Sequence, residues 1–193
     1  MKTVLLQVLS ILIFMNMEAV AQKTEWKIDP SHTSMNFAIS HFMIATVKGS
    51  FDTFEGTLKS DGEDFAKGKL EVTIQSKSIN TNQNDRDQHL RSEDFFGVEK
   101  NPQITFKSTR FEKIGDNQYK VHGILTMNGI SKEQTINATY KGSFEHPQFK
   151  KTIAVFDVSA DIPRLEFKVG EDYPGAALGE IVKLNSSVEL TKL

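Results

Sequence analysis

Apolar and polar residues alternate along most of the chain after residue 25. A period of two with one polar face predicts β-strands that are buried on one side only, and this pattern favours antiparallel pairing. The runs with this period cover residues 35–39, 70–74, 104–106, 119–127, 136–140, 154–162 and 182–190. The pattern therefore predicts an all-β protein with about eight strands.

Turn-forming residues separate these runs. Asn128-Gly129 lies between two of them and is a strong signal for a tight hairpin, while Asp61-Gly62 and residues 115–117 separate others. No stretch rich in Pro, Gly or Ser is long enough to link two domains. The sequence therefore predicts one domain over residues 22–193.

One polar region between residues 81 and 96 lacks the alternation. Asn84 is a suitable N-cap for a short helix over residues 84–91, and a second helical turn is expected at residues 164–167 after Pro163. The strands can close into a barrel or stack as a sandwich, and periodicity alone does not choose between them.

The first residues have the layout of a secretory signal peptide. Lys2 precedes an apolar run from Val4 to Met15, and Ala19-Val20-Ala21 places small residues before a cleavage site after Ala21. The apolar run of about 12 residues is shorter than the roughly 18 that span a bilayer. We therefore expect residues 1–21 to be removed and the protein to be periplasmic or secreted without stable membrane insertion, the alternative being an uncleaved anchor.

The composition excludes several classes of function. The formal net charge is −2, so there is no basic field for nucleic acid. The chain contains no cysteine, which excludes disulfides and zinc held by thiolates. The five histidines lack the close spacing of a zinc site, and the sequence has no Gly-rich phosphate loop before a helix. We therefore expect no metal and no cofactor.

Several motifs, in order and with matching gaps from Trp26 to the C-terminus, resemble the YceI-like family of exported bacterial proteins. The most specific is Arg86-Asp87-Gln88-His89-Leu90-Arg91 followed by Asp94-Phe95-Phe96. The chain departs from the family pattern at Thr33, where Ser is usual, and at Lys168, where Gly is usual. Other matching segments are residues 26–41, 49–56, 78–81, 102–108, 125–129 and 162–167.

This resemblance implies an eight-stranded antiparallel lipocalin-like β-barrel that binds a polyisoprenoid or another long-chain lipid in an elongated pore. The 14 phenylalanines fit such an apolar wall. Candidate pore-lining residues are Phe37, Phe51, Phe54, Leu90, Phe95, Phe106, Leu125 and Phe156. Arg86, His89 and Arg91 are candidates for contact with a polar head group, since a guanidinium suits a phosphate.

Each candidate also has a simpler interpretation. The phenylalanines could fill an ordinary core, and the spacing of Asp85 with His89 and of Asp87 with Arg91 could support only the helix. Two other functions stay open: an exported structural or partner-binding barrel with a filled core, and a hydrolase in which Asp87, His89 and a Ser share a cleft. The sequence fits either a monomer or a homodimer.

Overall fold

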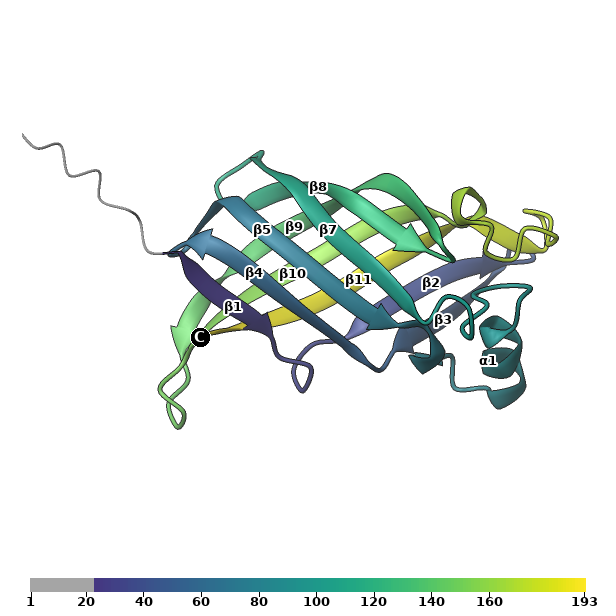
Figure 1. Ribbon diagram of the computed structural model, residues 1–193, viewed down its shortest axis with the longest axis horizontal. Coiled ribbons are helices and arrows are strands. Elements are labelled where there is room, and N and C mark those ends of the chain that lie inside the picture. Colours follow the sequence, from purple (N-terminus) through teal and green to yellow (C-terminus); the bar gives the residue numbers. More distant parts are fainter. Residues whose placement is uncertain (1–22) are drawn as a thin grey trace, which may run out of the picture.

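The computed structural model describes residues 23–193. The expected signal peptide and its cleavage site lie outside the described residues. Figure 1 shows an elongated barrel of long, tilted strands with one short helix at one end. Within residues 23–193, no helix has the length and apolar character needed to cross a bilayer.

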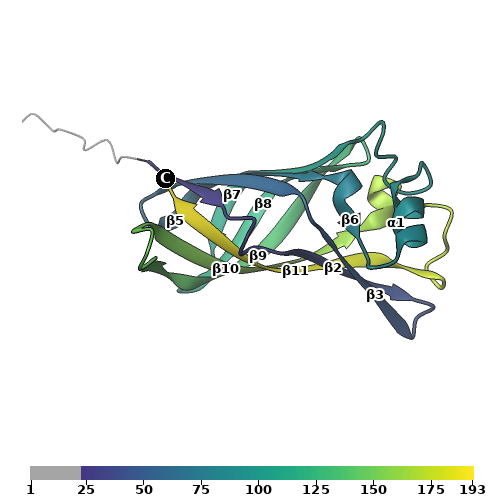
Figure 2. The same cartoon turned by 90° about the horizontal axis from the view of Figure 1, so that it is seen from below.

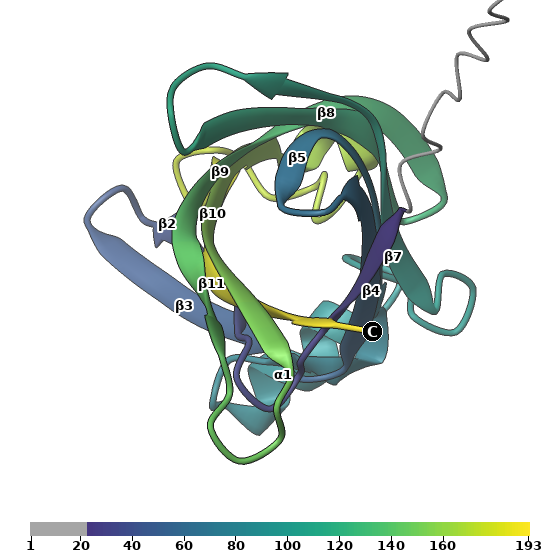
Figure 3. The same ribbon diagram turned by 90° about the vertical axis from the view of Figure 1, so that its left-hand side faces the viewer.

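Eight strands form the closed barrel. They are β1 (Thr24–Ile28), β4 (Phe54–Asp61), β5 (Asp64–Gln75), β7 (Gln103–Lys113), β8 (Gln118–Met127), β9 (Ile130–Glu145), β10 (Thr152–Pro163) and β11 (Leu178–Lys192). Each pairs antiparallel with the next in this order, and β1 also pairs with β11, which closes the ring (Figure 3). The predicted eight-stranded antiparallel barrel is confirmed, and a sandwich is excluded.

Three further strands extend the barrel at one end. They are β2 (Met35–His41), β3 (Ala45–Phe51) and the short β6 (Ile79–Asn80). The last residues of β11 pair with β1, and the first half of β11 pairs with β2. Strands β1 and β2 therefore lie one after the other along the same edge of β11. The β2–β3 hairpin projects beyond the barrel wall (Figure 2).

The helices lie at this same end. Helix α1 (Asn84–Arg91) and the two 3₁₀ turns η1 (Ser76–Ser78) and η2 (Arg164–Phe167) include both helical segments predicted from the sequence. The N-cap is one residue earlier than expected: the Gln83 side chain accepts a hydrogen bond from the backbone N–H of Arg86, so Asn84 is already helical. The longer amide side chain of Gln83 reaches the first turn from the extended residue before it.

The β8–β9 hairpin is the turn that the sequence indicates most clearly. Asn128 and Gly129 have φ values of 51° and 73°, and a two-residue hairpin turn of type I′ requires such positive values at both central positions. The Asn128 side chain also donates to the carbonyl of Phe167 at 3.2 Å, which ties the hairpin to η2.

Aromatic side chains fill the end of the barrel opposite to α1. Trp26 and Phe65 are fully buried, with ring centroids 5.7 Å apart, and Phe65 packs on Phe156 at 5.0 Å and on Tyr140 at 5.2 Å. The indole N–H of Trp26 donates to the hydroxyl of Ser60 at 2.9 Å, so the one polar atom of that ring is satisfied. This cluster closes the barrel at the end where the chain enters it.

Candidate functional site

A cavity of about 530 Å³ occupies the barrel interior. Its wall is almost wholly apolar because the inward-facing positions of every strand alternate with outward polar ones. The polar or partly polar side chains among the lining residues are His41, Thr81, Arg86, His89, Gln134, Arg164 and Tyr173. The interior is therefore hollow, which contradicts the alternative of a barrel with a filled core.

Most of the predicted pore residues line this cavity. They are Phe37, Phe51, Leu90, Phe95, Phe106, Leu125 and Phe156. Phe54 does not: it lies on the inward face of β4 and is buried in the packed core instead. Alternation along β4 gave the correct face for Phe54 but could not show how the side chains around it fill the space.

Only three lining residues are exposed, and all three lie at the end of the barrel that carries α1. Phe42 lies in the β2–β3 turn, and Arg86 and His89 lie on α1. At the opposite end Trp26 and Phe65 are fully buried. The cavity therefore has its mouth between the β2–β3 hairpin and α1.

Arg86 is held at the mouth by a hydrogen-bond network with Thr81 and Asp87. Its Nε donates to the Thr81 hydroxyl at 2.7 Å and its Nη2 donates to the Thr81 carbonyl at 2.8 Å. The buried Asp87 carboxylate accepts from the Thr81 backbone N–H at 2.8 Å and from the Thr81 hydroxyl at 2.5 Å. This network fixes the guanidinium on the cavity wall.

His89 belongs to a second group at the mouth. Its Nε2 lies 3.1 Å from Asp94 Oδ2 and 3.2 Å from the Tyr173 hydroxyl, and its ring packs edge-on against Phe95 at 5.0 Å. The side chain is thereby oriented by one acidic, one phenolic and one apolar neighbour.

Arg91, the third predicted head-group residue, does not line the cavity. Its Nε and Nη2 donate to the carbonyls of Lys77 and Ile79, both at 2.8 Å, so it fastens α1 to β6. The pairs expected along the helix are not formed within the described chain either. Asp87 instead accepts hydrogen bonds from Thr81, and His89 instead contacts Asp94.

Arg164 is a lining residue that the sequence argument did not single out. It is 1% exposed, and its guanidinium donates to the carbonyls of Val169, Gly170, Tyr173, Leu178 and Gly179. Burial lowers the pKa of Arg164, opposed by the charge of Glu180. The motif at residues 162–167 contained it, but nothing in the spacing showed that five carbonyls would surround it.

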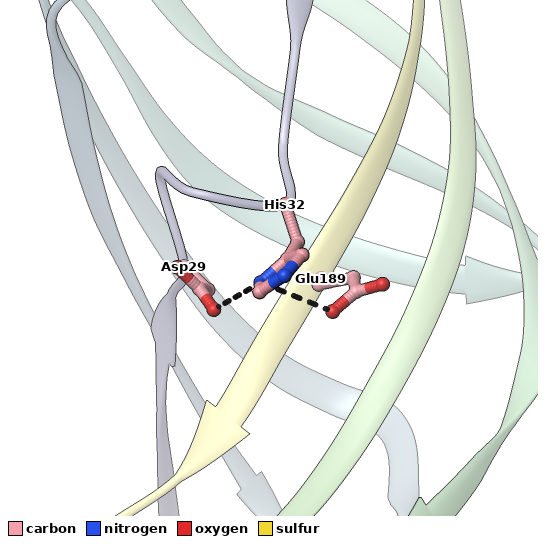
Figure 4. A group of neighbouring side chains, drawn as sticks. All are labelled: Asp29, His32 and Glu189. Atoms are coloured by element: carbon pink, nitrogen blue, oxygen red, sulfur yellow. Dashed lines mark hydrogen bonds and ion pairs between the residues drawn. The ribbon is translucent and has the colours of Figure 1, made fainter.

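A cluster of Asp29, His32 and Glu189 lies outside the barrel, where β1 passes into β2 (Figure 4). His32 Nδ1 is 2.9 Å from Asp29 Oδ2 and 4.0 Å from Glu189 Oε2. The hydrogen bond to Asp29 and the two carboxylate charges raise the pKa of His32, and the same hydrogen bond lowers the pKa of Asp29. These three side chains have the atoms of a cation site, but one ion-paired imidazole already satisfies them.

The arrangement expected of a hydrolase is not formed by the described residues. Asp87 contacts Thr81, whereas His89 contacts Asp94 and Tyr173, so the two do not act on one group. Within residues 23–193 no Ser hydroxyl is hydrogen-bonded to either side chain, and the Ser92 hydroxyl donates only to the backbone carbonyl of His89, at 2.8 Å.

Comparison with known proteins gives a consistent result. The family model for the YceI-like domain matches residues 26–190 of this chain. A UPF0312 protein of Staphylococcus aureus is 35% identical over 172 residues, which is 87% of this chain and 98% of that protein.

Two solved structures share the fold. The YCEI protein of Campylobacter jejuni is 33% identical, with a TM-score of 0.72 over 79% of this chain and 88% of that one. A polyisoprenoid binding domain from Saccharophagus degradans is 12% identical, with a TM-score of 0.64 over 87% of this chain and 98% of that domain. At that identity the second likeness concerns the fold alone.

Proposed function

The chain belongs to the YceI-like family, and we propose that it binds a long apolar lipid, a polyisoprenoid or a fatty-acid-like chain, inside its barrel. The observation that carries this proposal is the apolar cavity of about 530 Å³ with its mouth beside α1. Its size lies within the range of small-molecule sites, roughly 300–1,000 Å³. A pore that follows the strands suits an extended chain better than a compact ligand.

Burial alone supplies enough affinity. Each buried methylene group contributes about 0.8 kcal/mol, so about fifteen buried carbons contribute about 12 kcal/mol, less several for lost freedom of motion. A Kd of roughly 1 μM corresponds to about 8 kcal/mol. The ligand therefore needs no charged contact, and recognition rests on shape and apolar surface.

The polar end of the ligand is proposed to stay at the mouth. Arg86 uses Nε and Nη2 for Thr81, and no described residue accepts a hydrogen bond from its Nη1. His89 also faces the cavity and is exposed. These two side chains are suited to a phosphate, carboxylate or hydroxyl at the end of the chain.

Two further points support the assignment. The Saccharophagus domain with the same fold is described as polyisoprenoid binding, which is consistent with a long isoprenoid as ligand class. The predicted signal peptide supports a role outside the cytoplasm, so we propose a periplasmic or secreted carrier or storage protein that needs no cofactor.

Native mass spectrometry of the mature protein, purified from its host and followed by organic extraction, tests the proposal. We expect a co-purifying isoprenoid or other long-chain lipid. Phe156→Arg should abolish its retention, because a charge in the apolar wall has no partner there. Leu125→Asn is a milder change at a second lining position, useful if the first variant does not fold.

The matched control is Ile181→Arg, which adds the same charge at an exposed position of β11. It should retain the lipid. A folded protein that arrives empty and takes up no added long-chain lipid would exclude the carrier function.

A further inference from the structure

The tip of the β2–β3 hairpin exposes three consecutive large apolar side chains. Phe42 is 60% exposed, Met43 75% and Ile44 93%. The segment from His41 to Val47 contains no Asp, Glu, Lys or Arg. So much exposed apolar surface on one tip is unusual in a soluble protein and indicates an interaction site.

The backbone holds these side chains outward. Phe42 and Met43 have φ values of 49° and 62°, a left-handed conformation that bulky residues rarely adopt. The backbone N–H of Phe42 donates to the carbonyl of Ala177 at 2.9 Å, and β2 pairs with β3 from Met35 to His41. The tip is therefore a fixed feature of the hairpin.

The tip also adjoins the mouth of the cavity. Phe42 is at once exposed and part of the cavity wall, together with Arg86 and His89. Figure 2 shows the hairpin projecting at the end that carries α1. An apolar path thus runs from the tip into the barrel.

We propose that residues 42–44 insert into the surface of a lipid bilayer and hold the cavity mouth against it. The proposed function gives this contact its purpose, since a long apolar ligand resides in membranes and not in water. A tip of three side chains suits the roughly 5–10 Å depth of the bilayer interface. It is far smaller than the roughly 800 Å² that each partner buries in a stable protein interface, so a second copy is the weaker candidate.

Charges of both signs lie near the tip. The loop that follows Gly170 carries the exposed Glu171 and Asp172 and leads to Ala177, which is bonded to the tip, and the exposed Arg86 lies at the adjoining mouth. The contact therefore rests on the three apolar side chains. Phosphatidylcholine vesicles, which carry no net charge, are the probe that tests it.

Ile44→Trp reports the contact directly. The native Trp26 is fully buried and gives a constant background. On addition of phosphatidylcholine vesicles, the new indole should shift its emission to the blue and should be quenched by lipids brominated along the acyl chain. An indole that stays in a watery environment at saturating lipid would overturn the proposal.

Removal of the apolar tip tests its contribution. The double variant Met43→Asn with Ile44→Ser should lower vesicle partitioning at least about tenfold. Neither residue lines the cavity, so uptake of a soluble fluorescent fatty acid should be unchanged. Phe149→Ser is the matched control, since Phe149 is 66% exposed at the opposite end, and it should partition as the unmodified protein does.

The two readouts separate this inference from the proposed function. Tip-dependent vesicle binding without fatty-acid uptake would leave the bilayer contact standing and refute the lipid cavity. Fatty-acid uptake with equal vesicle binding by the tip variant and the unmodified protein would refute the bilayer contact. A concentration-dependent dimer that disappears in the tip variant would assign the tip to a second copy and would also refute it.

Discussion

At the scale of single residues, Arg164 holds together a loop that contributes to the cavity wall. All five N–H groups of its guanidinium donate to backbone carbonyls of residues 169–179, and no carboxylate of residues 23–193 forms an ion pair with it. A planar fork with five donors can gather a loop in this way, whereas the three donors of a Lys cannot. Arg164 is therefore a structural cation that gives one wall of the mouth its form.

Lys168 stands where the related family usually has Gly. Its φ of 54° and ψ of 30° place it in the left-handed region, at the C-cap of η2. A Gly at such a position marks either a positive φ or a close approach of the backbone, and the structure shows that the chain has the positive φ with a side chain present. The strain of a non-glycine residue in this region is roughly 1–2 kcal/mol.

Lys168→Gly should therefore stabilise the protein by about 0.5–1 kcal/mol, since the relief of strain exceeds the added entropy of the unfolded chain. Urea unfolding measures the difference. Lys132→Gly makes the same change at an exposed, extended position of β9 and should destabilise by a similar amount. A Lys168→Gly variant that loses as much stability as Lys132→Gly would show that the left-handed residue is not strained.

At the scale of elements, the connection between β1 and β2 is where the barrel edge changes partners on β11. The Thr33 hydroxyl accepts from the Glu189 backbone N–H at 3.0 Å, and the Asp29 N–H donates to the Glu189 carbonyl at 2.9 Å. The ion-paired His32 lies over this crossing, between Asp29 and Glu189 (Figure 4). Its charge state should therefore affect how firmly the two segments hold to β11.

The pH dependence of this contribution follows from the two pKa shifts. The pKa of His32 is raised above its ordinary 6.5, so its stabilisation is fully present below that pH and is lost as the pH rises through the folded pKa. The pKa of Asp29 is lowered from 3.8, so its stabilisation is present above that pH and is lost as the pH falls further. His32→Gln should therefore lower Tm more at about pH 5.5 than at about pH 8.5.

Thermal unfolding of both proteins at the two pH values measures this difference. Glu189→Gln should act in the same direction but more weakly, because its carboxylate is 4.0 Å from the imidazole. Thr33→Ser, at the same crossing, changes no titratable group and should change Tm equally at both pH values. An effect of His32→Gln that does not vary with pH would mean that the ion pair contributes nothing.

The strands were predictable from the sequence because the alternation of apolar and polar residues within each segment identifies its inward face. The pairing of β11 with both β1 and β2 was not, since register between distant segments depends on the closed ring. Alternation also could not distinguish Phe37 from Phe54, because both face inward and only Phe37 lines the cavity. Arg91 likewise carried a suitable charge, and only the structure shows that two carbonyls of residues 77–79 take its donors.

At the scale of the whole molecule, the barrel is a tube with one closed end. Aromatic rings around Trp26 and Phe65 fill the closed end, and rings along the wall lie against glycines on neighbouring strands. A Cβ on Gly49 would come within 2.5 Å of the Phe37 ring, and one on Gly123 would come equally close to Phe106. These glycines let the rings lie against the wall, which leaves the centre of the tube open.

A tube closed at one end should limit the length of chain that it accepts. Ala138 is a small buried lining residue on β9, two residues before Tyr140 of the aromatic cluster, so it lies toward the closed end. Ala138→Phe should fill that end and exclude the last few carbons of the longest ligands. Each excluded methylene group costs about 0.8 kcal/mol, which is about fourfold in affinity.

Affinities for a series of fatty acids of increasing length give the measurement. In the unmodified protein, affinity should rise with each added carbon up to a limit, and in Ala138→Phe that limit should fall by several carbons while shorter chains bind as before. Ala38→Phe makes the same change on β2 at a residue that does not line the cavity, and it should leave the limit where it was. Equal weakening of short and long chains by Ala138→Phe would argue against a ligand that enters from the α1 end with its tail toward the aromatic cluster. If Ala138→Phe lowers the chain length at which affinity stops rising, the result would instead establish the orientation of the lipid. Only the end of the lipid that reaches residue 138 would be displaced by the added ring.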